Sequence, residues 1–287
     1  MLLSHELQAS LLASQGVTSE SRTISNYATH LMTAGHGAAS FVWFPALGES
    51  AVSFGPALVA LAGKLAGNCN VVAVDPPGYG GSQLRDGKPW PTFGELAPWT
   101  GEVLTQIAGT GRRLVVAGNS SGGAIALGGV NRASDSVIAG LVFVSWPDWR
   151  YGQPPTASEL CPVDVPALRQ LLARSWHTPP PIPDSIAQLI IARLSSRAYY
   201  AHVASFDARE YVAELDRYRG PLAFVGGTSD RLVSPAVMEA SAAAHAHRSV
   251  LRWMPDCGHY PHHEARDRFV DELAALTLKF LGELGDG

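Results

Sequence analysis

Short apolar segments recur along the chain, and stretches with helical spacing separate most of them. Each segment is four or five residues long and is mostly apolar rather than alternating, with Asp75 and Arg252 as the charged exceptions, which is typical of a strand buried on both faces of a sheet. These segments are residues 41–44, 71–75, 114–117, 141–144, 222–225 and 250–253. Because helices must then cover both faces, the pattern predicts an α/β protein with a mostly parallel central sheet.

The two ends of the chain add elements to this sheet. Within residues 1–20, leucines recur at helical spacing and predict a short amphipathic helix on the outside of the protein. Residues 22–33 alternate loosely and predict an antiparallel strand at the sheet edge. Near the C-terminus, apolar residues recur at steps of three and four and predict a closing helix against the sheet. These residues are Phe269, Leu273, Leu276, Phe280 and Leu284.

A long segment between two of the predicted strands differs in kind from the rest. About seventy residues separate Ser145 from Pro221, which is far more than a simple crossover needs. Prolines divide this segment into at least two helical stretches, near residues 167–176 and 184–194. We therefore predict a core formed by residues 1–145 and 212–287, with residues 146–211 inserted as a helical cap over the sheet edge.

Composition and charge limit the classes of molecule that the protein is expected to bind. Of the 287 residues, 46% are hydrophobic and 16% are charged, which suits a sizeable folded core. The net charge is −4 and lysines and arginines do not cluster, so neither nucleic acid nor an anionic membrane surface is expected as a partner. The expected partner is a small-molecule substrate.

The distribution of cysteine and histidine gives no sign of a metal or a disulfide framework. The three cysteines, Cys69, Cys161 and Cys257, are widely spaced. His262 and His263, like the pair His245 and His247, are expected to be solvated, because no cysteine or carboxylate pattern completes a zinc ligand set. The sequence thus predicts no metal and no cofactor. The first sixteen residues lack the features of a signal peptide, so a cytoplasmic location is expected.

A serine between two glycines follows one predicted strand. Residues 114–117 are followed by Gly118-Asn119-Ser120-Ser121-Gly122 and then by the helix-like residues 123–127. A strand, a sharp turn and a helix in this order form a nucleophile elbow, with Ser120 at the tip. The alternative is a Gly/Ser-rich turn that only joins a strand to a helix.

An acid and a base follow two later strands. Asp230 lies just past the strand at 222–225, and His259 lies just past the strand at 250–253. A serine hydroxyl needs a base to remove its proton, and a carboxylate-oriented histidine is the usual base. The order Ser120, Asp230, His259 matches the order of the triad in α/β-hydrolases.

Four motifs in this order resemble the α/β-hydrolase superfamily over nearly the whole chain. They are the elbow at 118–122, Asp75–Ser82 with its Asp-x-x-Gly-x-Gly-x-Ser pattern, the acid loop at 227–233, and Gly258-His259 followed by Glu264. The resemblance implies an α/β-hydrolase fold with an inserted helical cap and a catalytic triad of Ser120, Asp230 and His259. Some relatives recruit their acid from an earlier strand, which leaves Asp148 as a competitor to Asp230.

The resemblance also implies an oxyanion hole formed by the backbone N–H groups of Leu47 and Ser121. Here the chain departs from the family, because Pro45-Ala46 stands where His-Gly is usual. Aromatic residues in or beside the cap are candidates for lining an apolar substrate pocket, with ordinary packing as the alternative. These residues are Trp146, Trp149, Tyr151, Trp176 and Tyr260.

Three functions follow from these expectations. The first is a serine hydrolase that cleaves an ester or related acyl bond of a small, fairly apolar substrate without a cofactor. The second is a carbon–carbon bond hydrolase of the meta-cleavage type, because Gly-Asn-Ser-x-Gly-Gly at the elbow also resembles those enzymes. The third is a receptor-like binding module with slow or no turnover, which the altered oxyanion loop motivates.

Overall fold

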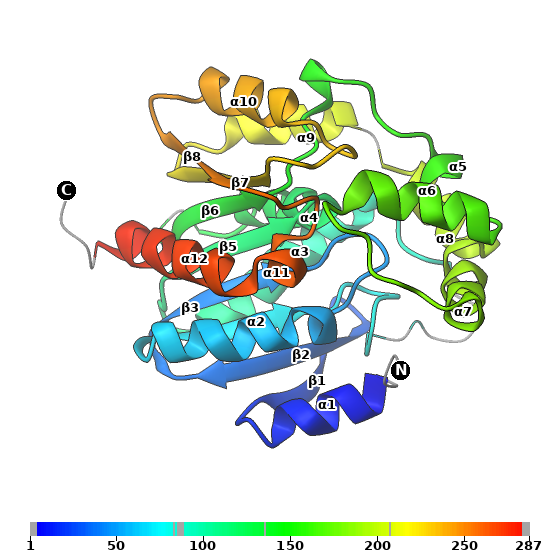
Figure 1. The fold of residues 1–287 in the computed structure, drawn as a ribbon. Coiled ribbons are helices and arrows are strands. Elements are labelled where there is room, and N and C mark those ends of the chain that lie inside the picture. The colour runs from blue at the N-terminus through cyan, green and yellow to red at the C-terminus, as the bar shows by residue number, and fades with distance from the viewer. Residues whose placement is uncertain (1–4, 83, 85–88, 135, 207, 283–287) are drawn as a thin grey trace.

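The central sheet has eight strands in the order β1-β2-β4-β3-β5-β6-β7-β8 (Figure 1). The structure is a computed structural model that describes residues 5–82, 84, 89–134, 136–206 and 208–282. The strands are β1 Thr18–Ile24, β2 Tyr27–Gly35, β3 Gly37–Phe44, β4 Gly67–Val74, β5 Leu114–Asn119, β6 Ile138–Val144, β7 Leu222–Gly227 and β8 Ser249–Met254. The neighbouring strands in the series β4-β3-β5-β6-β7-β8 are all parallel, which confirms the predicted mostly parallel sheet.

The antiparallel edge is a hairpin rather than the single strand expected over residues 22–33. β1 pairs with β2, and β2 pairs antiparallel with β4. Ser25 and Asn26 both adopt positive φ values, 48° and 67°, and this left-handed pair forms the tight turn that separates the two strands.

Helices cover both faces of the sheet, so neighbouring residues of one strand pack into two different hydrophobic cores. Val115 packs in the core under α2 (Ala51–Lys64) and α12 (Arg266–Leu281), whereas Val116 packs in the core under α3 (Phe93–Ala108) and α4 (Ser121–Val130). In Figure 1, α2 and α12 lie in front of the sheet and α3 and α4 lie behind it. The burial of both faces explains why these strands have continuous apolar sequences.

Both terminal helices are present. The N-terminal helix α1 spans His5–Ala13, and Leu12 packs against Gly55 of α2. The closing helix α12 buries Phe269, Leu273 and Leu276, while Leu284 lies outside the described residues. None of the helices in the described ranges has the length and apolar character needed to span a membrane.

The segment predicted as a cap is helical. It contains the 3₁₀ turn η1 Trp149–Tyr151, α5 Ala157–Leu160, α6 Val165–Ser175, α7 Asp184–Leu194, α8 Arg197–Ala204 and the start of α9 Ala208–Arg217. Helices α5 to α8 lie together at one end of the sheet (Figure 1). The expected cap boundary at residue 211 falls inside α9, whose Tyr211 and Leu215 belong to the same core as α4. The helix α10 (Pro235–Ala244) covers β7 and β8.

A buried histidine joins α8 to the core. His202 donates its Nδ1–H to the carbonyl of Pro91 at 2.7 Å, and the Tyr79 hydroxyl donates to His202 Nε2 at 3.0 Å. The ring also stacks on Phe93, with centroids 4.8 Å apart. Burial lowers the pKa of His202 to about 4, although the bond to Pro91 favours its charged form.

We expect His202 to make folding sensitive to acid. The unfolded chain takes up this proton near pH 6.5, whereas the folded chain takes it up only near pH 4. Stability is therefore lost as the pH falls through this window, by up to about 3 kcal/mol. Denaturant unfolding of the wild type and of His202→Asn at pH 7.5 and 4.5 measures this contribution.

The variant His202→Asn should be less stable at pH 7.5 but should lose less stability on acidification. An equal loss of unfolding free energy in both proteins would show that other groups cause the acid sensitivity.

Candidate active site

Ser120 occupies a strained turn that only its glycine neighbours permit. Its φ and ψ are 52° and −119°, and α4 begins at the next residue. A Cβ on Gly118 would lie 2.2 Å from the backbone of Gly122, and a Cβ on Gly122 would lie 2.3 Å from the carbonyl oxygen of Phe44. Non-glycine residues rarely adopt such angles, so the surrounding structure must hold Ser120 there. This is the elbow geometry that the sequence predicted.

Asp230 and His259 form a buried hydrogen-bonded pair. Asp230 Oδ2 accepts the Nδ1–H of His259 at 2.7 Å, and each side chain is about 1% exposed. Asp230 Oδ1 accepts the backbone N–H groups of Leu232 and Val233, each at 2.9 Å. Because Nδ1 carries the donated proton, the lone pair of Nε2 remains available to a substrate or a nucleophile.

Asn119 connects the elbow to the histidine loop, a role that the sequence analysis missed. Its side chain is fully buried and donates to the carbonyl of His259 at 3.1 Å and to that of Val144 at 3.2 Å. A polar residue at the end of an otherwise apolar strand was the available signal, because a buried amide needs partners.

The end of helix α6 forms hydrogen bonds to the loops that carry Asp230 and His259. The carbonyl of Ser175 accepts the backbone N–H of His259 at 2.6 Å. The preceding carbonyl, that of Arg174, accepts the backbone N–H of Arg231 at 2.9 Å. The end of α6 thus fixes the backbone beside Asp230 and at His259.

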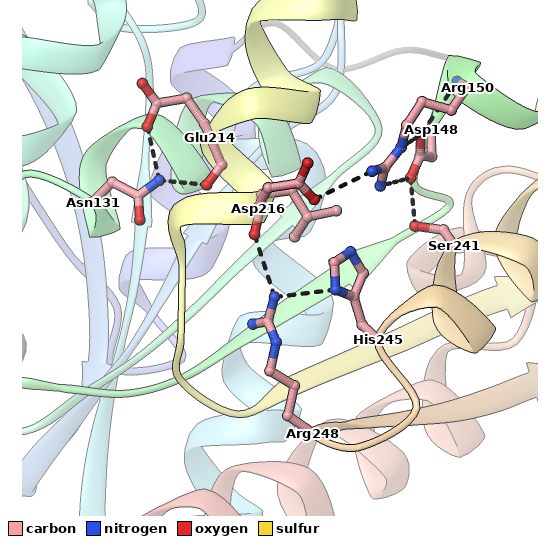
Figure 2. Close-up of polar contacts among 9 residues, drawn as sticks. Asn131, Asp148, Arg150, Glu214, Asp216, Ser241, His245 and Arg248 are labelled. Atoms are coloured by element: carbon pink, nitrogen blue, oxygen red, sulfur yellow. Dashed lines mark hydrogen bonds and ion pairs between the residues drawn. The ribbon is translucent and has the colours of Figure 1, made fainter.

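Asp148 lies away from His259. It is 1% exposed, receives two hydrogen bonds from the Arg150 guanidinium, at 2.9 and 2.7 Å, and accepts the Ser241 hydroxyl at 2.7 Å (Figure 2). Burial opposes its ionisation, but Arg150 and Ser241 keep the pKa of Asp148 below its usual value. The structure therefore brings Asp230, and not Asp148, to the histidine.

The two serines of the elbow differ in access. Ser120 is half-buried, and its hydroxyl makes no hydrogen bond within the described residues, whereas the Ser121 side chain is 2% exposed and its Oγ has no partner there. Ser120, His259, Ser121 and Leu47 all line one cavity. Across the described part of the chain, the backbone N–H groups of Leu47 and Ser121 have no hydrogen-bond acceptor, as the predicted oxyanion hole requires.

This cavity has a volume of about 1470 Å³ and a mainly apolar lining. Of the aromatic residues singled out in the sequence, Trp149, Trp176 and Tyr260 line it. Further lining residues come from α1, α6, α7 and the proline segment between the latter two, which the sequence analysis had not assigned to a pocket. They include Leu11, Leu172, Pro180, Pro183, Ile186 and Ile190.

Trp146 and Tyr151 do not line the cavity. Trp146 is 2% exposed and packs on Phe143, with ring centroids 4.2 Å apart. The positive φ of Ser145, 48°, changes the chain direction just before this tryptophan. Tyr151 is 41% exposed and lies against the Arg150 guanidinium.

Two of the four histidines that were expected to be solvated are buried. His262 is 3% exposed, and its Nε2 lies 3.0 Å from Glu49 Oε1, while His263 Nε2 lies 2.9 Å from the same oxygen. Burial opposes ionisation of Glu49, yet the two rings hold its pKa well below the usual range. His245 is also buried, and burial lowers its pKa, whereas His247 is exposed. The expectation of four solvated histidines was therefore wrong for His245 and His262.

The fold and this geometry define an α/β protein with a serine elbow beside an acid–histidine pair. A model of the alpha/beta hydrolase family matches residues 33–272, so the chain belongs to this family, and membership indicates a hydrolase. No curated protein sequence matches the chain significantly.

Solved structures agree on the fold. A putative lipase from Acinetobacter baumannii has a TM-score of 0.79 and 16% identity, with 99% of both chains covered. A putative aryl esterase from Burkholderia cenocepacia has a TM-score of 0.69 and 20% identity, covering 92% of this chain and 100% of that one. A meta-cleavage product hydrolase from Pseudomonas fluorescens has a TM-score of 0.68 and 16% identity, covering 92% and 98%. At these identities the similarity shows the fold.

The two candidate acids should respond differently to substitution. We expect Asp230→Asn to lower kcat for an activated ester by up to about 10⁴-fold, because the imidazolium loses its counter-charge and the tautomer is wrong. Asp148→Asn should leave kcat nearly unchanged and lower the free energy of unfolding by about 1–3 kcal/mol, because it weakens the bonds from Arg150. Steady-state kinetics and denaturant unfolding of both variants distinguish the roles. A severe loss of kcat in Asp148→Asn alone would reverse the assignment.

Proposed function

We propose that this protein is a serine hydrolase that cleaves an ester or related acyl bond through an acyl-enzyme on Ser120. The observation that carries this proposal is the hydrogen bond between Asp230 and His259 beside a strained serine that lines the same cavity. A strained serine, an oriented imidazole and unpaired N–H groups are together the parts that acyl transfer needs.

The proposed reaction uses only residues of this chain. His259 Nε2 takes the proton of the Ser120 hydroxyl as Oγ attacks the carbonyl carbon, and the carbonyl oxygen becomes an oxyanion held by the N–H groups of Leu47 and Ser121. Collapse of this intermediate expels the alcohol, which receives the proton from His259. Water, deprotonated by His259, then attacks the acyl-enzyme, and collapse of the second intermediate releases the acid while His259 returns the proton to Ser120 Oγ. Asp230 keeps the imidazole oriented and stabilises its charged form in each step.

The cavity is large enough for apolar substrates bigger than the small ones expected from the sequence. Its volume of about 1470 Å³ exceeds the roughly 300–1,000 Å³ of common ligand pockets. Apolar residues from both the cap and the core line it, so we propose that the acyl or alcohol part in contact with them is apolar or aromatic.

The lining also favours an ester over the carbon–carbon alternative. Within the described ranges, no arginine or lysine lines the cavity. A vinylogous diketone that carries a carboxylate would leave this charge without a cation in an apolar cavity, which is costly. Measuring activity on such a diketone beside an ester panel compares the two reactions directly.

Ser120→Ala should lower kcat by about 10⁴- to 10⁶-fold, because the nucleophile is lost. Ser121→Ala keeps the backbone N–H that would bind the oxyanion and should cost far less. Steady-state kinetics of both variants with one activated ester tests the elbow assignment. Comparable losses in the two variants, with both proteins folded, would contradict it.

Substitutions of Trp149 and Trp146 should show which of these residues binds substrate and which stabilises the core. Trp149 lines the cavity, so Trp149→Ala should raise KM for bulky esters by roughly tenfold and shift the chain-length preference. Trp146 lies in the core, so Trp146→Ala should instead lower the free energy of unfolding by about 3–5 kcal/mol. An ester panel and denaturant unfolding provide the two measurements. An unchanged panel in Trp149→Ala would mean that other residues determine specificity.

A further inference from the structure

Beside the proposed catalytic residues lies a second cluster of polar side chains, which the proposed reaction does not use. Glu49 follows β3, and His262 and His263 lie on the short helix α11 (Pro261–Glu264). The ligand atoms of all three residues lie within 4.8 Å of one another. Glu49 and His263 also line the cavity that contains Ser120.

Hydrogen bonds within the cluster leave two polar atoms without partners. Both imidazole Nε2 atoms lie against Glu49 Oε1, at 3.0 and 2.9 Å. Glu49 Oε2 and His262 Nδ1 are buried, and neither has a hydrogen-bond partner in the described structure. A buried carboxylate oxygen with no donor is costly, and a cation would satisfy it.

Packing holds His262 in position before any ligand arrives. Its ring lies 5.5 Å from Trp43, 6.1 Å from Phe54 and 6.3 Å from Phe269, measured between centroids. The side chain of His263 is 30% exposed. One ligand is thus fixed by the core, and another lies near the surface, where it can adjust and where an ion can enter.

We propose that Glu49, His262 and His263 form a binding site for a divalent transition metal ion of the zinc type. Two imidazoles and one carboxylate are ligands that Zn²⁺ accepts, with a fourth position left for water or a substrate. Tetrahedral Zn²⁺ ligands lie about 3.3 Å apart, so each Nε2 atom needs to move a few tenths of an ångström away from Glu49 Oε1, which it approaches to 3.0 Å in His262 and 2.9 Å in His263. The inference does not depend on ester hydrolysis, because it concerns residues outside the proposed triad.

Binding requires each Nε2 to lose its proton, so both rings must carry their proton on Nδ1. His262 then buries an Nδ1–H without an acceptor, where most metal-binding histidines have one. We therefore expect a dissociation constant on the order of micromolar rather than nanomolar.

The bound ion would join two loops of the proposed active site. Glu49 lies two residues after Leu47, and His262 lies three residues after His259. A metal bridge between them would fix the oxyanion loop relative to the histidine loop.

Calorimetric titration of the tag-free, chelator-treated chain with Zn²⁺ tests the site. We expect binding of one equivalent in the wild type, and an affinity at least about tenfold weaker in Glu49→Gln and in His263→Ala. His247→Ala removes an exposed histidine and is the matched control, so it should bind as the wild type does. Far-UV circular dichroism establishes that each variant is folded, and the partly exposed His263 provides the variant with the least risk of unfolding.

A second readout comes from Trp176, whose ring stacks on His263 with centroids 5.7 Å apart. Co²⁺ in place of Zn²⁺ should quench part of the tryptophan fluorescence in the wild type and in His247→Ala, but not in His263→Ala. No binding of Zn²⁺ by the wild type would overturn the proposal. Binding that survives in both Glu49→Gln and His263→Ala would overturn it as well, because the ion would then lie elsewhere.

Discussion

The arrangement of the candidate site depends on the close packing of the elbow against the neighbouring strand. Gly122 lies so near the carbonyl oxygen of Phe44 that a Cβ would clash with it, and Gly118 lies as near to Gly122. This contact holds Ser120 at a positive φ and places the start of α4 beside the loop that carries Leu47. One steric constraint thus brings together the proposed nucleophile and the two N–H groups of the proposed oxyanion hole.

Residues of the predicted cap and of the core together hold His259, the proposed base, in position. His259 is fixed by Asp230 at its ring and by Ser175 and Asn119 at its backbone. Glu264 adds a further bridge, because one carboxylate oxygen accepts the N–H of Gly258 at 2.8 Å and the other accepts that of His177 at 2.7 Å. Movement of α6 would therefore disturb the loop that carries His259, so under the proposed mechanism a change in α6 would affect the chemical step.

The sequence was sufficient to predict features that depend on the residues of a single strand. Val115 and Val116 face different cores, which explains why the apolar run that contains them has no polar face and predicted a strand covered on both faces. The positions of Ser120, Asp230 and His259 in the fold were predictable because each follows a strand of the parallel sheet, and their catalytic roles stay predictions. Sequence patterns failed where the burial of a side chain depends on an unusual backbone angle or on residues far away in the chain. The positive φ of Ser145 places Trp146 in the core, and Trp43, Phe54 and Glu49, far away in the chain, bury His262.

The most direct test of the account is to trap the acyl-enzyme. The protein is mixed with an excess of an activated apolar ester, quenched in acid within the first turnover, digested and analysed by mass spectrometry. We expect an acyl group on the Ser120 side chain, with a burst of alcohol close to one equivalent followed by steady turnover. Steady turnover without an adduct would contradict the covalent mechanism, an adduct on Ser121 would contradict the elbow assignment, and a burst without later turnover would indicate a receptor-like protein.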